Sequence, residues 1–262
     1  MSAIILRDEI IHYEVLGRGK PLIFLHDWVG SWRYWIPTMQ AASLSFRTYA
    51  IDLWGFGDTA KNPENYTLEQ QLELLNDFMN ELGMGRVALI GHGLGAVLSM
   101  LFTLRYPNCV DRVMGVSLPM DEDAIHPRVR SGSPVELADW LLGRNSNHGA
   151  AWSEATKADP KAILLTLTGL QSIDLFGLPG RVETPMLLVH GLNDPAISLP
   201  DADRIAGLPE NSHQIIFEQS GHYPMLDETS KFNRLLSDFL SLLSGTSPRQ
   251  LQLKEEWKRR VR

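Results

Sequence analysis

The sequence has 262 residues, of which 44% are hydrophobic and 21% charged, as in ordinary folded globular proteins and unlike disordered or fibrous ones. The formal net charge of −7 argues against a nucleic-acid-binding protein, because neutralising phosphates requires a basic surface. The length suits one large α/β domain with an insertion, and a small molecule or another protein is the expected partner.

The single cysteine, Cys109, excludes an internal disulfide. It follows a helical pattern that ends at a proline, and we expect it to pack as a small apolar residue rather than to act as a nucleophile. The first residues, MSAIILRDEI, lack the basic flank, apolar run and cleavage site of a signal peptide. These features favour a cytoplasmic protein without a transmembrane segment.

Short apolar runs alternate with helical patterns along the first half of the chain, which predicts a mostly parallel sheet. Residues 3–16 favour an opening hairpin that turns at Arg7 and Asp8. The next predicted elements are a buried strand over 21–27, a helix around 32–40 and a strand over 47–53.

Two further helices are marked by local signals. Thr67 and Gln70 form a capping-box pattern at the start of a helix that ends at Gly83. Residues 86–107 then read as a buried strand, a turn with three glycines and a long apolar helix.

An insertion separates the next two predicted strands. The strand over 112–118 is followed by strand-like residues only at 185–191, and roughly 65 intervening residues are far more than the two to six of a usual βα connection. Helical patterns at 134–143 and 160–171 predict a small helical cap over the sheet edge where ligands bind.

The chain therefore divides into three predicted parts. A last strand over 213–219 and a helix over 228–243 complete the core. We expect a core of residues 1–118 and 185–245, a cap of residues 119–184 and a basic tail of residues 246–262.

The tail holds six basic and two acidic residues, and Leu253, Trp257 and Val261 fall four apart on one helical face. That stripe is typical of a surface that packs on its own domain or on a second subunit, so a homo-oligomer is possible. Peripheral contact with an anionic membrane surface is the alternative.

Five segments in chain order together resemble the α/β-hydrolase superfamily, in its capped branch of esterases and C–C hydrolases. They are LIFLHDWVGSW, DLWGFGDT, GHGLG, LLVHGLNDP and QSGHYPMLD. The resemblance implies an α/β-hydrolase fold, with a mostly parallel sheet flanked by helices and the cap inserted before the acid-bearing strand. It also implies a small-molecule substrate or ligand.

The resemblance also assigns roles to individual residues. His222 matches the triad base and Asp194 the triad acid, and the chain order agrees with the family. Gly93 stands at the nucleophile position of the strand-to-helix elbow. The backbone amides of Trp28 and Leu94 match the oxyanion hole.

Two of these positions depart from the family pattern. Gly93 offers no oxygen or sulfur for covalent catalysis, so it excludes a serine-hydrolase mechanism. Asp27 replaces the glycine of the family's His-Gly pair, where a carboxylate disfavours a developing oxyanion.

Four aromatic side chains are candidates for the substrate pocket: Trp28, Trp32, Trp54 and His92. The three tryptophans lie on loops expected to meet over the site, although core packing is the leading explanation for them. His92 precedes the elbow centre, where packing is its simplest role.

Three hypotheses follow. In the first, an enzyme without a covalent step uses Asp194 and His222 as a base dyad. A water or a substrate oxygen fills the space left by the missing side chain of residue 93. Asp27 assists as an acid or base. The second is a retired ligand-binding or regulatory module. The third is an ordinary esterase-like hydrolase inactivated by a Ser-to-Gly change, in which Gly93→Ser should restore strong activity.

No cofactor or metal is expected. The glycine spacing of GHGLGA does not match a dinucleotide-binding loop, and metal-ligand spacings are absent from the sequence.

Overall fold

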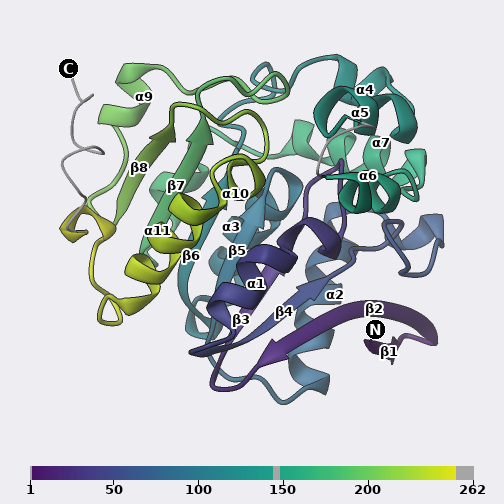
Figure 1. Cartoon of the computed structure of the whole chain (residues 1–262), viewed down its shortest axis with the longest axis horizontal. Helices are drawn as coiled ribbons and strands as arrows, with labels where there is room; N and C mark the ends of the chain where they lie inside the picture. The colour runs from purple at the N-terminus through teal and green to yellow at the C-terminus, as the bar shows by residue number, and fades with distance from the viewer. Residues whose placement is uncertain (1, 144–147, 252–262) are drawn as a thin grey trace.

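The computed structural model describes residues 2–143 and 148–251, which form an eight-stranded sheet flanked by helices (Figure 1). The strand order is β1-β2-β4-β3-β5-β6-β7-β8. The β1–β2 and β2–β4 pairs are antiparallel and the other pairs are parallel. The strands are β1 (Ser2–Leu6), β2 (Glu9–Gly17), β3 (Lys20–Leu25), β4 (Phe46–Ile51), β5 (Val87–His92), β6 (Val110–Val116), β7 (Met186–Gly191) and β8 (Ser212–Phe217).

The opening hairpin is confirmed, because Ile4 pairs with Ile11 and the turn lies at Arg7 and Asp8. Both turn residues have positive φ angles, 52° and 63°. Two successive positive φ angles match the twist of the flanking strands in a two-residue hairpin turn, which explains the polar residues at this point.

Helices cover both faces of the sheet, with α1 and α11 on one face and α2 and α3 on the other (Figure 1). The helices of the core are η1 (Trp32–Trp35), α1 (Ile36–Ala42), η2 (Pro63–Asn65), α2 (Leu68–Glu81), α3 (Leu94–Arg105), η3 (Pro107–Cys109), α9 (Ala202–Ala206), α10 (Pro224–Asp227), α11 (Thr229–Ser241) and η5 (Pro248–Gln250).

The start of α2 follows the prediction in part. The Thr67 hydroxyl accepts a hydrogen bond from the Gln70 amide, so Thr67 is the N-cap residue. This bond is one half of the predicted capping box. The helix ends at Glu81, two residues before Gly83.

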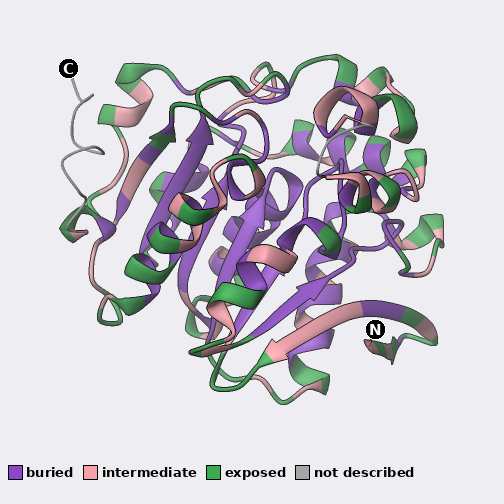
Figure 2. Cartoon of the chain, in the orientation of Figure 1, coloured by how far each residue is buried: buried purple, intermediate pink, exposed green. Residues whose placement is uncertain are grey.

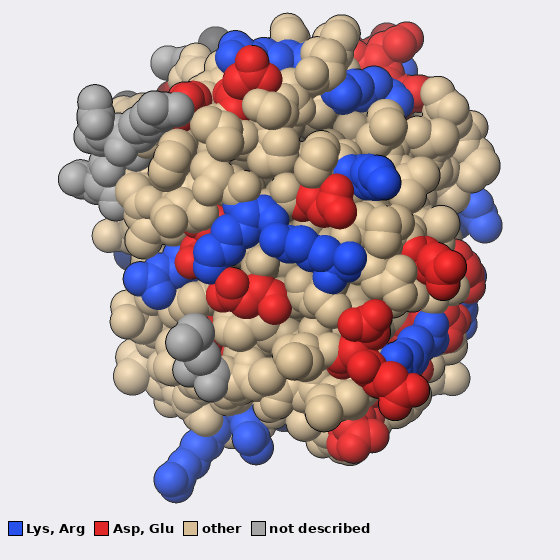
Figure 3. Space-filling view, turned by 90° about the vertical axis from the view of Figure 1, so that its right-hand side faces the viewer, with Lys and Arg blue, Asp and Glu red and all other residues tan. Residues whose placement is uncertain are grey.

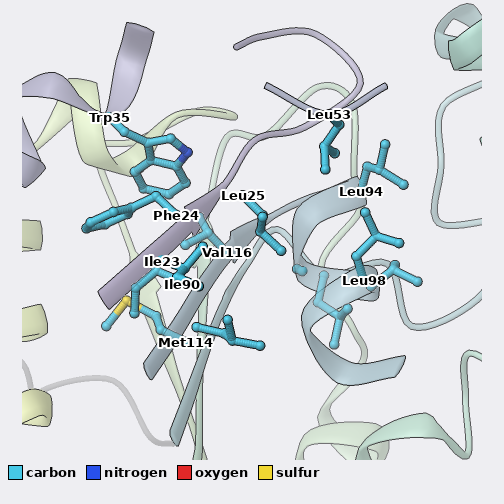
Figure 4. Packing of buried hydrophobic residues seen from close by; sticks show 14 of the residues in the cluster. Ile23, Phe24, Leu25, Trp35, Leu53, Ile90, Leu94, Leu98, Met114 and Val116 are labelled. Atoms are coloured by element: carbon cyan, nitrogen blue, oxygen red, sulfur yellow. The ribbon is translucent and has the colours of Figure 1, made fainter. Parts of the chain in front are cut away.

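The core lies between the central strands and these helices. Phe24, Ile90 and Met114 come from three neighbouring strands and point to one face of the sheet, and Leu98 of α3 lies on the other face (Figure 4). Each is at most 1% exposed. Figure 2 shows that the central strands are buried along most of their length. Burial on both faces explains why these strands are continuous apolar runs rather than alternating ones.

The described residues of the segment 119–184 form five helices and a short helical turn, and they lie beside the carboxyl ends of the strands (Figure 1). These elements are α4 (Arg128–Ser131), α5 (Pro134–Leu141), α6 (Gly149–Ala155), α7 (Pro160–Gly169), η4 (Leu170–Ser172) and α8 (Leu178–Arg181). We call residues 119–184 the inserted segment. The short helices α4, α6 and α8 had no separate signal in the sequence.

The inserted segment bonds to the core at several points, and three of these bonds involve Asp159 or Lys157. The Asp159 amide donates to the Gly55 carbonyl at 2.7 Å, and the Tyr66 hydroxyl donates to the Asp159 carboxylate at 2.9 Å. Lys157 forms an ion pair with Asp58 at 2.8 Å. Basic and acidic groups are interspersed on this side of the molecule (Figure 3).

The apolar stripe of the C-terminal tail, Leu253, Trp257 and Val261, lies outside the described residues. The part of the tail that is described follows α11 and contacts the end of the sheet. Arg249 donates to the backbone carbonyls of Ser212 and Leu208, both at 2.9 Å.

Candidate functional site

The turn between β5 and α3 brings the chain sharply from a strand into a helix. Gly93 has φ 47° and ψ −107°, a conformation that side-chain-bearing residues rarely adopt. A Cβ at Gly91 would lie 2.1 Å from the Gly95 carbonyl oxygen, and one at Gly95 would lie 2.3 Å from the Leu25 carbonyl oxygen. The flanking glycines are therefore required by close approach of the backbone.

The loop after β3 carries Asp27 to the same place, and its backbone is fixed on both sides. The His26 ring donates through Nδ1 to the Asp27 carbonyl at 2.7 Å and accepts from the Leu53 amide through Nε2 at 3.0 Å. The Asp27 amide donates to the Tyr34 hydroxyl at 2.8 Å. Burial lowers the pKa of His26 and keeps it neutral.

The Asp27 carboxylate lies directly against Gly93. Its Oδ1 accepts from the Leu94 amide at 2.9 Å, at the N-terminus of α3. A Cβ built on Gly93 would lie 1.7 Å from the same oxygen. The carboxylate therefore occupies the space that any side chain at residue 93 would enter. The expectation of an open space for water or a substrate oxygen beside His222 was wrong for this structure.

His222 bridges two carboxylates. Its Nε2 lies 3.0 Å from Oδ2 of Asp27, and its Nδ1 lies 2.9 Å from Oδ2 of Asp194. The loops that follow β3, β7 and β8 supply these three side chains. Since the carboxyl ends of parallel strands share one sheet edge, residues almost 200 positions apart meet there.

The Asp194 carboxylate is held from several directions. Its Oδ1 accepts from the amides of Ala196 and Ile197 at 2.8 and 3.0 Å. Its Oδ2 accepts from the Ser117 hydroxyl at 2.8 Å. These bonds orient the carboxylate toward the imidazole.

The two carboxylates determine the protonation of His222. Burial opposes a charged ring, but attraction to Asp194 and hydrogen bonds to both carboxylates outweigh burial and raise the pKa of His222 to about 10. The imidazolium in turn outweighs burial at both partners and lowers the pKa of Asp27 and of Asp194. At neutral pH the group is an imidazolium between two carboxylates, with a net charge of −1.

His92 lies beside this group. Its ring centroid is 4.5 Å from that of His222, and its Nδ1 is 3.0 Å from the Tyr34 hydroxyl. Burial and the charge of His222 lower the pKa of His92 to about 3. It is therefore a neutral ring, which packs against the charged one and also reaches the hydroxyl that holds the Asp27 backbone.

The three tryptophans have different surroundings. Trp28 is 1% exposed, and its indole nitrogen donates to the Thr166 hydroxyl of the inserted segment at 3.0 Å. Trp32 packs against His12, with ring centroids 5.5 Å apart. Trp54 is buried, and both its backbone amide and carbonyl bond to Gln71. Of these, the structure joins Trp28 most directly to Asp27 and the inserted segment.

Two neighbouring residues had no signal in the sequence. Ser117 follows β6 with a φ of 47°, and this unusual backbone presents its hydroxyl to Asp194. Tyr223 donates its hydroxyl to the Val29 carbonyl. A serine at the end of a strand beside the acid-bearing strand could have been considered, since neighbouring strand ends converge.

The chain is similar to known proteins over most of its length. The model of the Alpha/beta hydrolase family matches residues 22–235. The chain belongs to the Alpha/beta hydrolase family. This alpha/beta hydrolase is similar to 2-hydroxy-6-oxo-6-(2'-aminophenyl)hexa-2,4-dienoic acid hydrolase of Metapseudomonas resinovorans, with 25% identity over 87% of this chain and 87% of the relative.

Two other proteins show the breadth of the similarity. Epoxide hydrolase 4 of Homo sapiens is 31% identical over 87% of this chain and 75% of its own length. The crystal structure of the enol-lactonase from Burkholderia xenovorans LB400 has a TM-score of 0.79 at 18% identity and covers 92% of this alpha/beta hydrolase and 100% of that chain. The structural match supports the fold alone.

Within residues 2–143 and 148–251, no helix is long and apolar enough to cross a membrane. Nor do these residues contain a group of three or more histidine, cysteine, aspartate or glutamate side chains arranged to hold a metal ion.

Proposed function

We propose that this alpha/beta hydrolase acts on a small carbonyl or ester compound through an acid–base centre formed by Asp194, His222 and Asp27. The observation that carries the proposal is the 3.0 Å contact between Nε2 of His222 and Oδ2 of Asp27. In a Ser-His-Asp triad this nitrogen faces the nucleophile, and here it faces a carboxylate.

Gly93 occupies the nucleophile position in this proposal, and it takes no part in bond formation. Removing the nucleophile from a working triad lowers turnover roughly 10⁶-fold, while binding and the oxyanion hole alone retain about 10³ to 10⁴ over water. A carbonyl substrate must therefore react with water, or lose a proton, without an acyl-enzyme at residue 93.

The charge of the centre allows it to accept a proton. Two carboxylates and one imidazolium carry a net charge of −1, so Asp27 can take a proton from water or from a carbon next to a carbonyl while His222 remains charged. Because His222 lowers the pKa of Asp27, the carboxylate is a weak base. Activated esters and acidic carbonyl compounds are the substrates that such a base favours.

The inserted segment is proposed to select the substrate. Trp28 follows Asp27 in the chain and bonds to Thr166 in α7, so this contact joins the segment to the loop that carries the carboxylate. The relative from Metapseudomonas resinovorans is named as a hydrolase, which supports catalysis on a small compound.

A retired binding or regulatory module is the second candidate. The Asp27 side chain is 2% exposed and uses both the Leu94 amide and the His222 ring, so the polar groups of the centre are already paired within the protein. The third hypothesis, a Ser-to-Gly variant of an ordinary esterase, loses support because the Asp27 carboxylate leaves no room for a serine at residue 93.

The test is a panel of nitrophenyl esters, lactones and vinylogous diketones assayed with the wild type, His222→Ala and Asp27→Asn. We expect slow turnover by the wild type and a loss of at least tenfold in both variants. His213→Ala, at a partly buried histidine outside the centre, is the matched control. Absence of turnover together with ligand-dependent thermal stabilisation would support the binding module instead.

A further inference from the structure

We propose that the groove between α1 and α11 is a second binding site, which takes a small amphiphilic molecule with a neutral hydroxyl head and a short alkyl chain. The two helices lie side by side on one face of the sheet (Figure 1). The space between them has a volume of about 380 Å³, which is at the small end of the range of ligand pockets. Its size suits a compact ligand.

The groove is separate from the acid–base centre. Its lining residues come from α1, from α11 and from Ser45 and Phe46 at the start of β4. Phe46 pairs with Lys20 at the beginning of β3, whereas Asp27 follows the other end of that strand. Binding in the groove therefore goes beyond the proposed function, and a test of one does not decide the other.

Small side chains leave the space between the two helices. Ala41 and Ala42 of α1 line the groove opposite α11. On α11, Asn233, Ser237 and Ser241 recur every four residues, so they follow one face of the helix and line the same groove. With a rise of about 1.5 Å per residue, this row is about 12 Å long. It accommodates a short alkyl chain laid along the helix.

The groove has an apolar floor and a polar rim. Leu236 and Leu240 are buried and Phe46 is half-buried, whereas Ser237 and Ser241 are exposed. An alkyl chain on this floor would be largely removed from water, which favours binding. The floor therefore supplies affinity for the chain, and the polar groups decide which head group is accepted.

Two buried polar atoms at one end of the groove have no hydrogen-bond partner among the residues that the structure describes. They are Oγ1 of Thr38, a residue with 0% exposure, and Oδ1 of Asn233. The Asn233 amide nitrogen donates to the Pro37 carbonyl at 3.4 Å, which brings the amide next to residue 38 and identifies its oxygen as the free acceptor. Unpaired buried polar groups are rare and costly, so this pair indicates a ligand group that reaches both.

The chemistry of the two atoms selects a hydroxyl group. The amide oxygen of Asn233 only accepts, whereas the Thr38 hydroxyl can donate. An alcohol donates to the Asn233 oxygen and accepts from the Thr38 hydroxyl at the same time. A carboxylate or an ether can only accept, so either of them leaves the Asn233 oxygen unpaired.

The charges at the rim also favour a neutral ligand. Arg234 lines the groove, and its Nε is 3.8 Å from Oδ2 of Asp238, one turn further along α11. The guanidinium therefore already has an anionic partner within its own helix. An acidic head group would have to compete with this carboxylate.

The experiment is an NMR titration of the nitrogen-labelled wild-type protein with hexanol, methyl hexyl ether and hexanoate. These probes share an alkyl chain and differ in the head group. We expect hexanol to shift the amide signals of α1 and α11 that line the groove, and to bind about tenfold more tightly than either of the other probes, because only hexanol can donate to Asn233.

Two variants locate the site. Thr38→Val keeps the shape of the side chain but removes its hydroxyl, and it should weaken hexanol binding about tenfold while leaving the affinity for the ether unchanged. Ala41→Trp, at an exposed lining position, should fill the groove and abolish binding of all three probes. Thr168→Val, at an exposed threonine of α7, is the matched control and should leave hexanol binding unchanged.

Each other outcome would overturn the inference. Equal affinities for hexanol and the ether would show that the two polar atoms do not read the head group. Tighter binding of hexanoate would assign the groove to an anion instead. Shifts confined to residues outside α1 and α11, or no saturable binding of hexanol, would remove the site altogether. Because the three probes are compared on the wild type, the result does not depend on the folding of Thr38→Val.

Discussion

A serine introduced at residue 93 should be tolerated only when Asp27 is removed. The single variant Gly93→Ser places a Cβ 1.7 Å from Oδ1 and 2.4 Å from Cγ of Asp27, both far below van der Waals contact. Asp27→Gly removes these atoms and re-creates the glycine of the family's His-Gly pair. The experiment is therefore a double-mutant cycle of the wild type, the two single variants and the double variant.

The expected magnitudes come from two separate costs. A side chain at the φ of 47° observed for Gly93 costs about 1–3 kcal/mol in backbone strain. Overpacking against Asp27 adds about 1–3 kcal/mol, because the carboxylate is held by Leu94 and His222 and cannot move freely. In the Asp27→Gly background only the strain remains, so the two substitutions should couple favourably by about 1–3 kcal/mol.

Urea denaturation of the four proteins measures this coupling, and hydrolysis of a nitrophenyl ester provides the functional readout. We expect Gly93→Ser to be destabilised and inert. Asp27→Gly/Gly93→Ser should lose less stability than the sum of the losses in the two single variants, and it should hydrolyse the ester. Additive stability costs, or strong esterase activity in Gly93→Ser alone, would refute the steric argument.

Three further outcomes follow from the contacts of the centre. His222→Gln leaves two buried carboxylates without a cation and should lower the free energy of unfolding by about 3–5 kcal/mol, while His213→Gln changes it much less. Because the folded chain raises the pKa of His222 from 6.5 to about 10, the stabilisation is complete below about pH 6.5 and is lost as the pH rises toward 10. Urea midpoints should therefore fall over this range more steeply in the wild type than in His222→Gln, and parallel curves would contradict the shift. Thr166→Val deprives the buried Trp28 indole of its acceptor and should lower the free energy of unfolding by about 1–3 kcal/mol, as measured by chemical denaturation. Thr168→Val, at an exposed position, should change this free energy little. Equal effects of the two variants would contradict the proposed role of the contact.

The fold and the pairing of Asp194 with His222 could be predicted from the sequence. Buried parallel strands are continuous apolar runs, and the residues after each run reach one sheet edge, so Asp194 and His222 could be paired before any coordinates. The glycines around residue 93 indicated a crowded turn, which the 2.1 Å approach at Gly91 explains.

The contact between Asp27 and His222 was beyond sequence reasoning. Asp27 was recognised as a departure from the family, but a pattern of residue types does not contain the side-chain rotamer that turns its carboxylate toward Gly93. The same limit applies to Ser117, whose hydroxyl reaches Asp194 through a backbone angle that its sequence neighbours do not specify. The residue types alone predicted an open space beside Gly93. In the structure, the Asp27 carboxylate fills that space.

The central claim is that Asp27 replaces the side chain missing at residue 93 as the partner of His222. Nitrogen NMR of the imidazole rings tests it most directly, through the protonation of His222 between pH 6 and 11 in the wild type and in Asp27→Asn. The contacts predict that both ring nitrogens stay protonated past neutral pH with a midpoint near 10, and that Asp27→Asn lowers this midpoint. A His222 ring that is neutral at pH 7, or a midpoint that Asp27→Asn leaves unchanged, would contradict the account.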